Sequence, residues 1–393
     1  MKSPFLKLVS LLLCAVLILP FTLRVYADSP APDTADAAAQ FTLTLDTPSY
    51  ILIEASTGRV LCEKNADQPL PPASVTKVMT LLLVMEAIDS GIIKLTDNVP
   101  VSAEAAGKGG SQIYLEVGEA MTVDEMLKSV IIASANDAAV ALAELIAGSE
   151  EAFVDRMNAR AKQLGMENSH FENATGLDDS VENHTTSARD IAIMSSELMK
   201  HKKIFDYTTI WMDTVRDGAF GLTNTNRLIR FYNGANGLKT GSTSKAKFCI
   251  SATALRDNLQ LIAVIMAAPT RDSRNESAKK LLDFGFANYA YLMRESGSAG
   301  SVKILGGITS ECPTVYDHFG TVVEKSAGSK LDSNIQLPET IAAPVKAGDI
   351  IGRIEYSLGG VPLGEVAIKA AESVDKISFF GVLGRLTLKF FLN

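Results

Sequence analysis

The sequence has few of the side chains that build metal centres or disulfide frameworks. Its 393 residues include four histidines and four cysteines. One cysteine, Cys14, lies in an apolar leader, and the other three (Cys62, Cys249 and Cys312) have no metal-ligand spacing to one another. Because three is an odd number, we expect buried free thiols rather than disulfides. No motif indicates a metal or a cofactor, and we expect neither.

An excess of basic residues is also missing. Lys and Arg number 37 against 45 Asp and Glu, which gives a net charge of −8 at pH 7. Residues 1–27 carry three of the basic side chains and no acid, so the rest of the chain has 34 basic and 45 acidic side chains and a net charge of −11. This balance argues against a nucleic-acid partner. Hydrophobic residues at 47% and charged residues at 21% are typical of a globular protein.

One long apolar run stands near the N-terminus. Leu8–Leu19 is almost unbroken and follows Lys2 and Lys7, and Val25-Tyr26-Ala27 fits a small-x-small cleavage site. The pattern predicts a secretory signal peptide over residues 1–27, and therefore export across the cytoplasmic membrane. The alternative is an uncleaved anchor helix, but the run is short for a bilayer span.

Strand patterns stand on both sides of a helical region in the next part of the chain. Tyr50–Glu54 and Arg59–Cys62 predict a hairpin, and residues 237–267 contain three more β-like runs. Helical spacing marks residues 74–90, 121–147, 151–165, 187–200 and 272–294. The early and late strands would have to pair in one sheet. We therefore expect an α/β (α+β) fold, with an antiparallel sheet, flanking helices and a helical subdomain.

The sequence pattern changes after residues 295–301, which we predict to be a linker. Short strands and Gly-Gly turns then continue through Ile368 and predict a small C-terminal all-β domain. The predicted organisation is a signal peptide (1–27), a mixed helix–strand domain (28–298), a β domain (299–372) and a tail helix (373–393). A passive spacer is the simplest role for the β domain.

The tail predicts an amphipathic helix with a wide apolar face. At about 100° per residue, six large apolar side chains fall within an arc of about 140°. They are Phe379, Phe380, Leu383, Leu386, Phe390 and Phe391. Ser378, Arg385 and Lys389 lie opposite, so the pattern favours a helix lying on a membrane surface. The alternative is a terminal helix docked on its own protein.

A serine and a lysine stand one helical turn apart in Ser74-Val-Thr-Lys77. Side chains at this spacing share a helix face, with Cβ atoms about 5–6 Å apart. A neutral lysine can take the serine proton, but its pKa must fall from about 10.4 toward 7, at a cost of about 4 kcal/mol. The chain has five S-x-x-K matches, and Pro71-Pro72 before Ser74 and the apolar helix after it distinguish this one.

Two further motifs follow in order. Ser134-Ala-Asn136 interrupts an apolar, Ala-rich stretch, where polar groups need partners or a task. Its alternative role is a helix cap. Lys239-Thr240-Gly241 is the one K-T-G in the chain and opens a β-run, and a hairpin edge with a solvated lysine is its simpler explanation. In this order, the three motifs form the signature of penicillin-binding proteins and serine β-lactamases.

The chain resembles the low-molecular-mass penicillin-binding proteins that are serine D-alanyl-D-alanine carboxypeptidases. The likeness extends over the whole mature chain and implies a β-lactamase/transpeptidase-like fold for residues 28–298, as well as the β domain and the tail. The segments that carry it, besides the three motifs, are Ser49–Val60, Pro72–Thr80, Gly165–Phe171, Ala188–Asp190 and Asn236–Gly241.

The resemblance implies a catalytic role for each motif. Ser74 would attack the carbonyl of the penultimate D-Ala of a peptidoglycan stem pentapeptide and form an acyl-enzyme, with Lys77 as the base. Ser134 would relay a proton to the departing D-Ala, and Asn136 would hold the acyl-side amide. The N–H groups of Ser74 and Ser242 would form an oxyanion hole.

The resemblance also implies how the substrate carboxylate is held. Lys239 and Thr240 would receive it, Gly241 would let the ligand lie close to the strand, and Arg274 matches a family arginine near the same place. The implied partners are a stem peptide ending in D-Ala-D-Ala, β-lactam inhibitors and the membrane surface. The implied location is outside the cytoplasmic membrane, anchored by the tail.

Three alternatives remain open. A class A β-lactamase would need an E-x-x-L-N pattern, and none stands between the second and third motifs. A transpeptidase shares all three motifs and differs in the acceptor. A catalytically inactive peptidoglycan-binding module is disfavoured because the motifs are intact. His170 and His184 lie in polar connecting sequence without an H-x-x-x-H pattern, so we expect neither to be catalytic.

Overall fold

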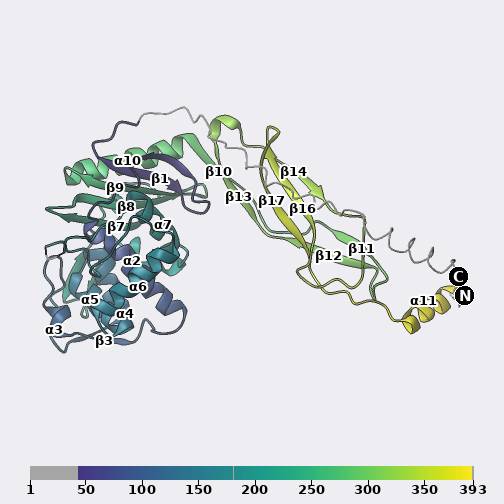
Figure 1. Cartoon of the computed structure of the whole chain (residues 1–393), viewed down its shortest axis with the longest axis horizontal. Helices are drawn as coiled ribbons and strands as arrows, with labels where there is room; N and C mark the ends of the chain where they lie inside the picture. Colours follow the sequence, from purple (N-terminus) through teal and green to yellow (C-terminus); the bar gives the residue numbers. More distant parts are fainter. Residues whose placement is uncertain (1–42, 180, 392–393) are drawn as a thin grey trace, which may run out of the picture. The chain divides into compact units, whose positions relative to one another are not determined.

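The computed structural model describes residues 43–179 and 181–391 (Figure 1). The predicted signal peptide lies outside these residues. No helix in the described ranges is both long and apolar enough to cross a lipid bilayer.

A five-stranded antiparallel sheet organises the first part of the described chain. Its order is β2-β1-β9-β8-β7. The strands are β1 (Ser49–Glu54), β2 (Val60–Lys64), β7 (Ala235–Thr243), β8 (Lys247–Arg256) and β9 (Leu259–Ala268). Tyr50 on β1 pairs with Ile265 on β9, so the early and late strands share one sheet as predicted. All six residues of β1 are buried, which explains its continuous apolar run.

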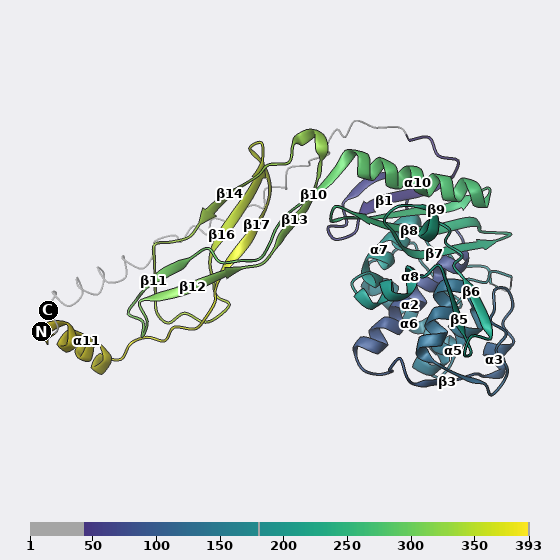
Figure 2. The same ribbon diagram turned by 180° about the vertical axis from the view of Figure 1, so that it is seen from behind.

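Helices cover both faces of this sheet (Figures 1 and 2). One face packs against α10 (Arg271–Asn288), and the other packs against α7 (Ala188–Leu198), behind which lies α2 (Lys77–Asp89). The helical subdomain adds α4 (Val123–Lys128), α5 (Asn136–Ala147) and α6 (Glu150–Gln163). This arrangement confirms the predicted mixed fold.

Short elements connect these units. They are η1 (Ala73–Thr76), β3 (Asn98–Pro100), α3 (Ala103–Ala106), β4 (Ala120–Thr122), η2 (Ser129–Ala133), η3 (Lys202–Ile204), α8 (Phe205–Thr208), β5 (Met212–Val215), β6 (Phe220–Thr223) and α9 (Leu228–Phe231). Two of them matter most for the site, because η1 begins the helical run of α2 and η2 precedes the break before α5.

The predicted polar interruption of the Ala-rich stretch is a break between two helices. The chain passes through the π-helical turn η2 and reaches Ser134, whose φ of 65° is left-handed. Asn136 then begins α5, whose alanines allow close packing against its neighbours. The break takes Ser134 out of the helix, but the residue stays buried, with 4% of its surface exposed.

The helix predicted for residues 272–294 is too long. Its helical part, α10, ends at Asn288, and Tyr289–Arg294 form strand β10. This strand pairs with β13 (Phe319–Glu324), from Tyr289 opposite Glu324 to Arg294 opposite Phe319. The partner strand lies some way along the chain, beyond the predicted linker. Local spacing therefore could not reveal the pairing, which favours the extended form of this Tyr-rich segment.

The C-terminal part is all-β, as predicted. Its six-stranded sheet has the order β14-β16-β17-β12-β11-β15. The strands are β11 (Ser301–Leu305), β12 (Glu311–Tyr316), β14 (Leu331–Gln336), β15 (Thr340–Ala342), β16 (Ile350–Leu358) and β17 (Val361–Ala370), with the turn η4 (Lys325–Ala327). Phe319 stacks on Tyr356 at 4.2 Å in one of its small cores. Helix α11 (Phe379–Phe391) follows.

Candidate active site

Ser74 and Lys77 meet at the start of the first long helix. Pro71 and Pro72 precede η1, which carries Ser74, and Lys77 begins α2. The Lys77 Nζ lies 3.0 Å from the Ser74 Oγ, so the predicted pair is within hydrogen-bond distance. Lys77 is completely buried, whereas Ser74 keeps some exposure to solvent.

Among residues 43–179 and 181–391, no carboxylate lies within contact distance of the Lys77 amine. Its other two polar neighbours are the Asn136 Oδ1 at 2.5 Å and the Thr175 carbonyl oxygen at 2.8 Å. Burial holds the pKa of Lys77 well below its ordinary value, and the positive charge of Lys239 lowers it further. Asp137 and Glu150 act in the opposite direction from a distance. A neutral amine 3.0 Å from a serine hydroxyl can accept its proton.

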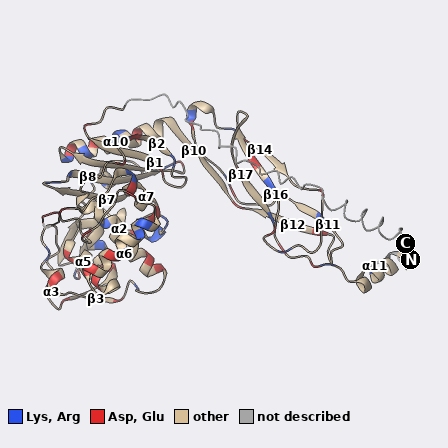
Figure 3. Cartoon of the chain, viewed as in Figure 1, with Lys and Arg blue, Asp and Glu red and all other residues tan. Residues whose placement is uncertain are grey.

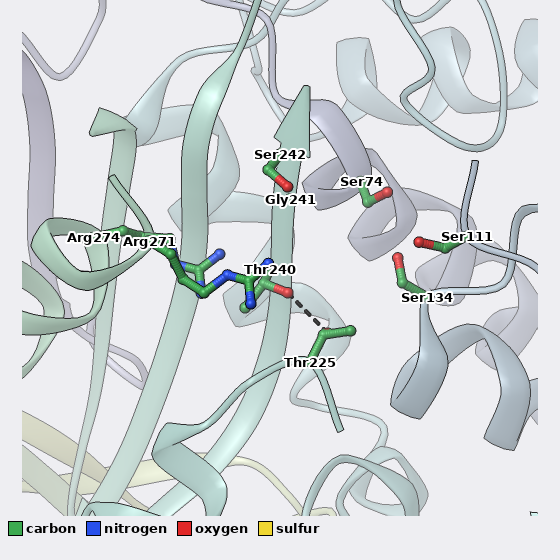
Figure 4. Close-up of a pocket in the computed structure, with 9 residues that line it drawn as sticks. All are labelled: Ser74, Ser111, Ser134, Thr225, Thr240, Gly241, Ser242, Arg271 and Arg274. Carbon is green, nitrogen blue, oxygen red and sulfur yellow. Dashed lines mark hydrogen bonds between the residues drawn. The ribbon is translucent and has the colours of Figure 1, made fainter. Parts of the chain in front are cut away.

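The second motif lies beside this pair. The Ser134 hydroxyl lines the same cavity as Ser74 (Figure 4). Asn136 is 2% exposed, and its Nδ2 donates to the Gly109 carbonyl at 2.6 Å while its Oδ1 faces Lys77. Asn136 therefore links the lysine to the loop that contains Gly109.

The third motif brings strand β7 against η1. A methyl group on Gly241 would lie 2.8 Å from the Ser74 backbone nitrogen and 2.8 Å from the Pro72 carbonyl oxygen. Glycine at this position therefore allows the strand to approach the nucleophile closely. The neighbouring Thr240 hydroxyl lies 2.8 Å from the Thr225 hydroxyl, and Ser242 follows on the strand beside Ser74 (Figure 4).

Cations gather at one side of the cavity. Basic positions occur along α10 (Figure 3), and Arg271 and Arg274 in its first turn line the cavity. Lys239 is 1% exposed; burial and the charge of Arg274 lower its pKa to about 7. Burial, together with Arg271, lowers the pKa of Arg274 to about 10. A carboxylate placed here would relieve the mutual repulsion of these cations.

The cavity joins all three motifs in a volume of about 190 Å³. The residues that line it are Ser74, Ser111, Ser134, Thr225, Thr240, Gly241, Ser242, Arg271 and Arg274. Three of them (Ser111, Thr225 and Arg271) are absent from the sequence prediction. They stand in connecting segments or in a helix turn and carry no motif, so no local pattern could have distinguished them.

His184 is the residue whose surroundings the sequence predicted least well. It was placed in polar connecting sequence, but it is 3% exposed, and its Nε2 lies 2.7 Å from the hydroxyl of Thr76, inside the first motif. Its Nδ1 accepts from the Glu172 backbone N–H, so Nε2 carries the proton and donates to Thr76. Burial lowers the pKa of His184 to about 4, and the side chain is neutral at pH 7.

Two family models match the chain. The sequence model of the D-alanyl-D-alanine carboxypeptidase family matches residues 34–270. A second model, of the C-terminal domain of penicillin-binding protein 5, matches residues 297–376.

Individual relatives cover most of the chain. D-alanyl-D-alanine carboxypeptidase DacF of Bacillus subtilis is 41% identical over 386 residues, which is 96% of this chain and 97% of the relative. The crystal structure of penicillin-binding protein 5 from Haemophilus influenzae superimposes with a TM-score of 0.72 at 29% identity, covering 85% of this chain and 99% of its own. Penicillin-binding protein D2 of Listeria monocytogenes, in its ampicillin-bound form, matches with a TM-score of 0.57 at 30% identity, covering 62% of this chain and 98% of its own.

The depressed pKa of His184 predicts an acid-sensitive fold. An unfolded histidine has a pKa of about 6.5, so between pH 6.5 and 4 the unfolded chain binds the proton more readily. The stability is therefore fully present above about pH 6.5 and is lost as the pH falls through 4. We expect His184 to account for a loss of about 2–3 kcal/mol between pH 7 and 4.5, measured by urea unfolding.

The matched variants are His184→Gln, which cannot titrate, and His170→Gln, which removes an exposed histidine of the same connection. His184→Gln should lose less stability on acidification than the wild type, and His170→Gln should behave as the wild type does. Equal losses in all three proteins would contradict the assignment.

Proposed function

This chain belongs to the D-alanyl-D-alanine carboxypeptidase family of serine peptidases, and from that premise we propose that Ser74 is its acylating nucleophile and Lys77 its base. The chain is a D-alanyl-D-alanine carboxypeptidase of cell-wall peptidoglycan metabolism, as the sequence predicted. The observation that carries the residue assignment is the 3.0 Å separation between the buried Lys77 amine and the Ser74 hydroxyl.

Acylation begins when the Ser74 hydroxyl proton passes to the Lys77 Nζ. The Ser74 Oγ forms a bond to the carbonyl carbon of the penultimate D-Ala of a stem pentapeptide. The N–H groups of Ser74 and Ser242 stabilise the oxyanion, a role that the close packing of Gly241 on η1 supports. The C–N bond then breaks; Ser134 gives its hydroxyl proton to the amine of the departing D-Ala and takes the proton held by Lys77, so that both groups are restored. Water hydrolyses the resulting ester and restores Ser74.

The cationic side of the cavity binds the terminal carboxylate. Lys239 and Arg274 supply charge and Thr240 supplies a hydroxyl. The pKa values of both cations are depressed in the free enzyme, so a bound anion favours their charged forms. This side of the cavity selects substrates that end in a free carboxylate, which is what a carboxypeptidase requires. β-Lactams carry a carboxylate next to a reactive amide and should occupy the same groups.

Covalent labelling tests the nucleophile. Wild-type protein incubated with a labelled penicillin should retain one label per chain, and Ser74→Ala should retain none, because the ester bond requires the Ser74 Oγ. Mass spectrometry of the labelled peptide locates the site. Ser242→Ala is the control: it also replaces a serine of the cavity but leaves the nucleophile Ser74 in place, and it should still be labelled. Labelling of a folded Ser74→Ala protein would show that another residue is acylated.

The pH dependence of D-Ala release tests the role of the Lys239 charge. The pKa of Lys239 is about 7, so the cation is present below that pH and is lost as the pH rises through it. We expect kcat/KM, which reports groups of the free enzyme, to fall above about pH 7. Lys239→Arg keeps the cation and should move the fall to higher pH. A wild-type kcat/KM that is constant from pH 7 to 9 would contradict the assignment.

We further propose that the chain is exported by residues 1–27 and held at the membrane surface by α11. The six apolar side chains of its predicted face are all exposed, from 52% at Leu383 to 83% at Phe390. Their exposure favours a lipid surface over docking on the rest of the protein. Each large side chain that enters a membrane contributes about 1.5–3 kcal/mol when fully buried.

Sedimentation with phosphatidylglycerol-containing vesicles tests this anchor. Leu383→Gln removes an apolar side chain from the predicted face, and Leu388→Gln makes the same change outside it, at similar exposure. We expect Leu383→Gln to weaken vesicle binding of residues 28–393 by about 10-fold or more and Leu388→Gln to weaken it much less. Equal effects, or a wild-type chain that stays in the supernatant, would contradict the proposal.

A further inference from the structure

One cation of the cavity has no partner in the described part of the chain. Arg271 and Arg274 stand in the first turn of α10, and both side chains extend toward Thr240 at one side of the cavity (Figure 4). Among residues 43–179 and 181–391, the Arg271 side chain makes neither an ion pair nor a hydrogen bond. It is exposed, and an arginine keeps its charge, so its guanidinium group is open to an anionic ligand.

Arg274 differs from Arg271 in both respects. It is 3% exposed, and its Nε and Nη2 atoms donate to the Asn275 Oδ1 at 3.1 and 2.9 Å. With Lys239 and Thr240, it belongs to the group that the proposed function assigns to the terminal carboxylate. A substrate that ends in D-Ala brings one carboxylate to this side of the cavity. Arg271 therefore remains as an additional cation beside an already complete carboxylate site.

The spacing of the two arginines suits a ligand with two carboxylates. Residues three apart share a helix face, with Cβ atoms about 5–6 Å apart. In a terminal D-Asp or D-Glu, the side-chain carboxylate stands one or two methylene groups from the α-carbon that bears the other carboxylate. One carboxylate can then bind at Arg274 while the other reaches Arg271, since guanidinium groups pair well with carboxylates. The methyl group of D-Ala leaves Arg271 unpaired.

The charges nearby also favour an anion at Arg271. Its charge lies close enough to Arg274 to lower the pKa of that side chain. Asp272 acts on Arg274 in the opposite direction, but it makes no ion pair with Arg271 within the described ranges. A second carboxylate placed between the two arginines would reduce their repulsion.

We propose that Arg271 forms a second anion site beside the terminal-carboxylate site, and that through it the enzyme prefers a leaving D-amino acid with an acidic side chain, such as D-Glu or D-Asp, over its neutral amide. The inference rests on the proposed function, because the scissile carbonyl at Ser74 and the terminal carboxylate at Arg274 bring the side chain of the last residue toward Arg271. The reaction is the same hydrolysis, in which the C–N bond breaks and water supplies the new carboxylate oxygen and the proton of the released amine.

Peptides that differ in the last residue alone test the proposal. Nα,Nε-diacetyl-L-Lys-D-Ala is followed by D-Glu, by D-Gln or by D-Ala, and the first two residues have nearly the same shape but differ in charge. We expect the wild-type kcat/KM to be about 2- to 5-fold higher for the D-Glu peptide than for the D-Gln peptide, as for a solvent-exposed ion pair. Arg271→Gln should remove this preference, and Arg271→Lys should retain most of it.

Lys280→Gln is the matched control, because Lys280 is an exposed cation of the same helix that does not line the cavity. It should keep the wild-type preference, whereas an effect of net charge would lower the preference equally in Lys280→Gln and Arg271→Gln. Weaker binding of the terminal carboxylate in Arg271→Gln would lower kcat/KM for both peptides and cancel in their ratio.

Three results would overturn the proposal: equal kcat/KM for the D-Glu and D-Gln peptides in the wild type, a D-Glu preference that survives Arg271→Gln, or an equal loss of preference in Lys280→Gln. A wild-type protein that releases no D-Ala from the D-Ala-D-Ala peptide would instead overturn the proposed function.

Discussion

The site depends on one constraint, the burial of the Lys77 amine where no carboxylate of the described part of the chain contacts it. The two carboxylates that raise its pKa from a distance are occupied elsewhere. Asp137 binds backbone N–H groups of the 107–118 loop, and Glu150 accepts from Lys108 and from the Ala174 backbone. An ammonium group in this place would be a buried charge with neutral partners alone, which is strongly unfavourable. Burial therefore favours the neutral amine, which is the form a general base requires.

The elements around Lys77 are arranged to maintain this environment. The connection between α6 and α7 passes beneath η1, where a methyl group on Gly176 would lie 1.8 Å from the Ala73 carbonyl oxygen. The same connection contributes the Thr175 carbonyl to Lys77 and the His184 ring to Thr76. On the other side, Gly241 brings β7 against η1. With these segments packed around it, the Lys77 side chain is fully buried.

What the sequence could predict follows from how local each signal is. Ser74 and Lys77 are one helical turn apart, so their proximity follows from the sequence alone. The continuous apolar run of β1 and the Ala-rich sequence of α5 reflect burial, so these elements could also be predicted without a structure. Strand β10 was mistaken for helix because its partner strand lies beyond the linker.

The site residues that the sequence did not predict have the same explanation. Ser111 and Thr225 reach the cavity from connecting loops, and the Thr175 group that contacts Lys77 is a backbone carbonyl, which no residue type encodes. His184 reaches Thr76 across 108 residues of sequence. Contacts of this kind depend on how the elements pack and appear only when the chain is folded.

The ionisation of Lys77 is the property to measure most directly. Lysine labelled with ¹⁵N at Nζ would give one resonance for each side chain, and Lys77→Arg would identify the resonance of Lys77. A Nζ signal of a neutral amine at pH 7 is the predicted result, because burial and the charge of Lys239 hold the pKa of Lys77 well below its ordinary value. An ammonium signal that persists until about pH 10, as for a solvated lysine, would contradict the neutral base and with it the proposed acylation of Ser74.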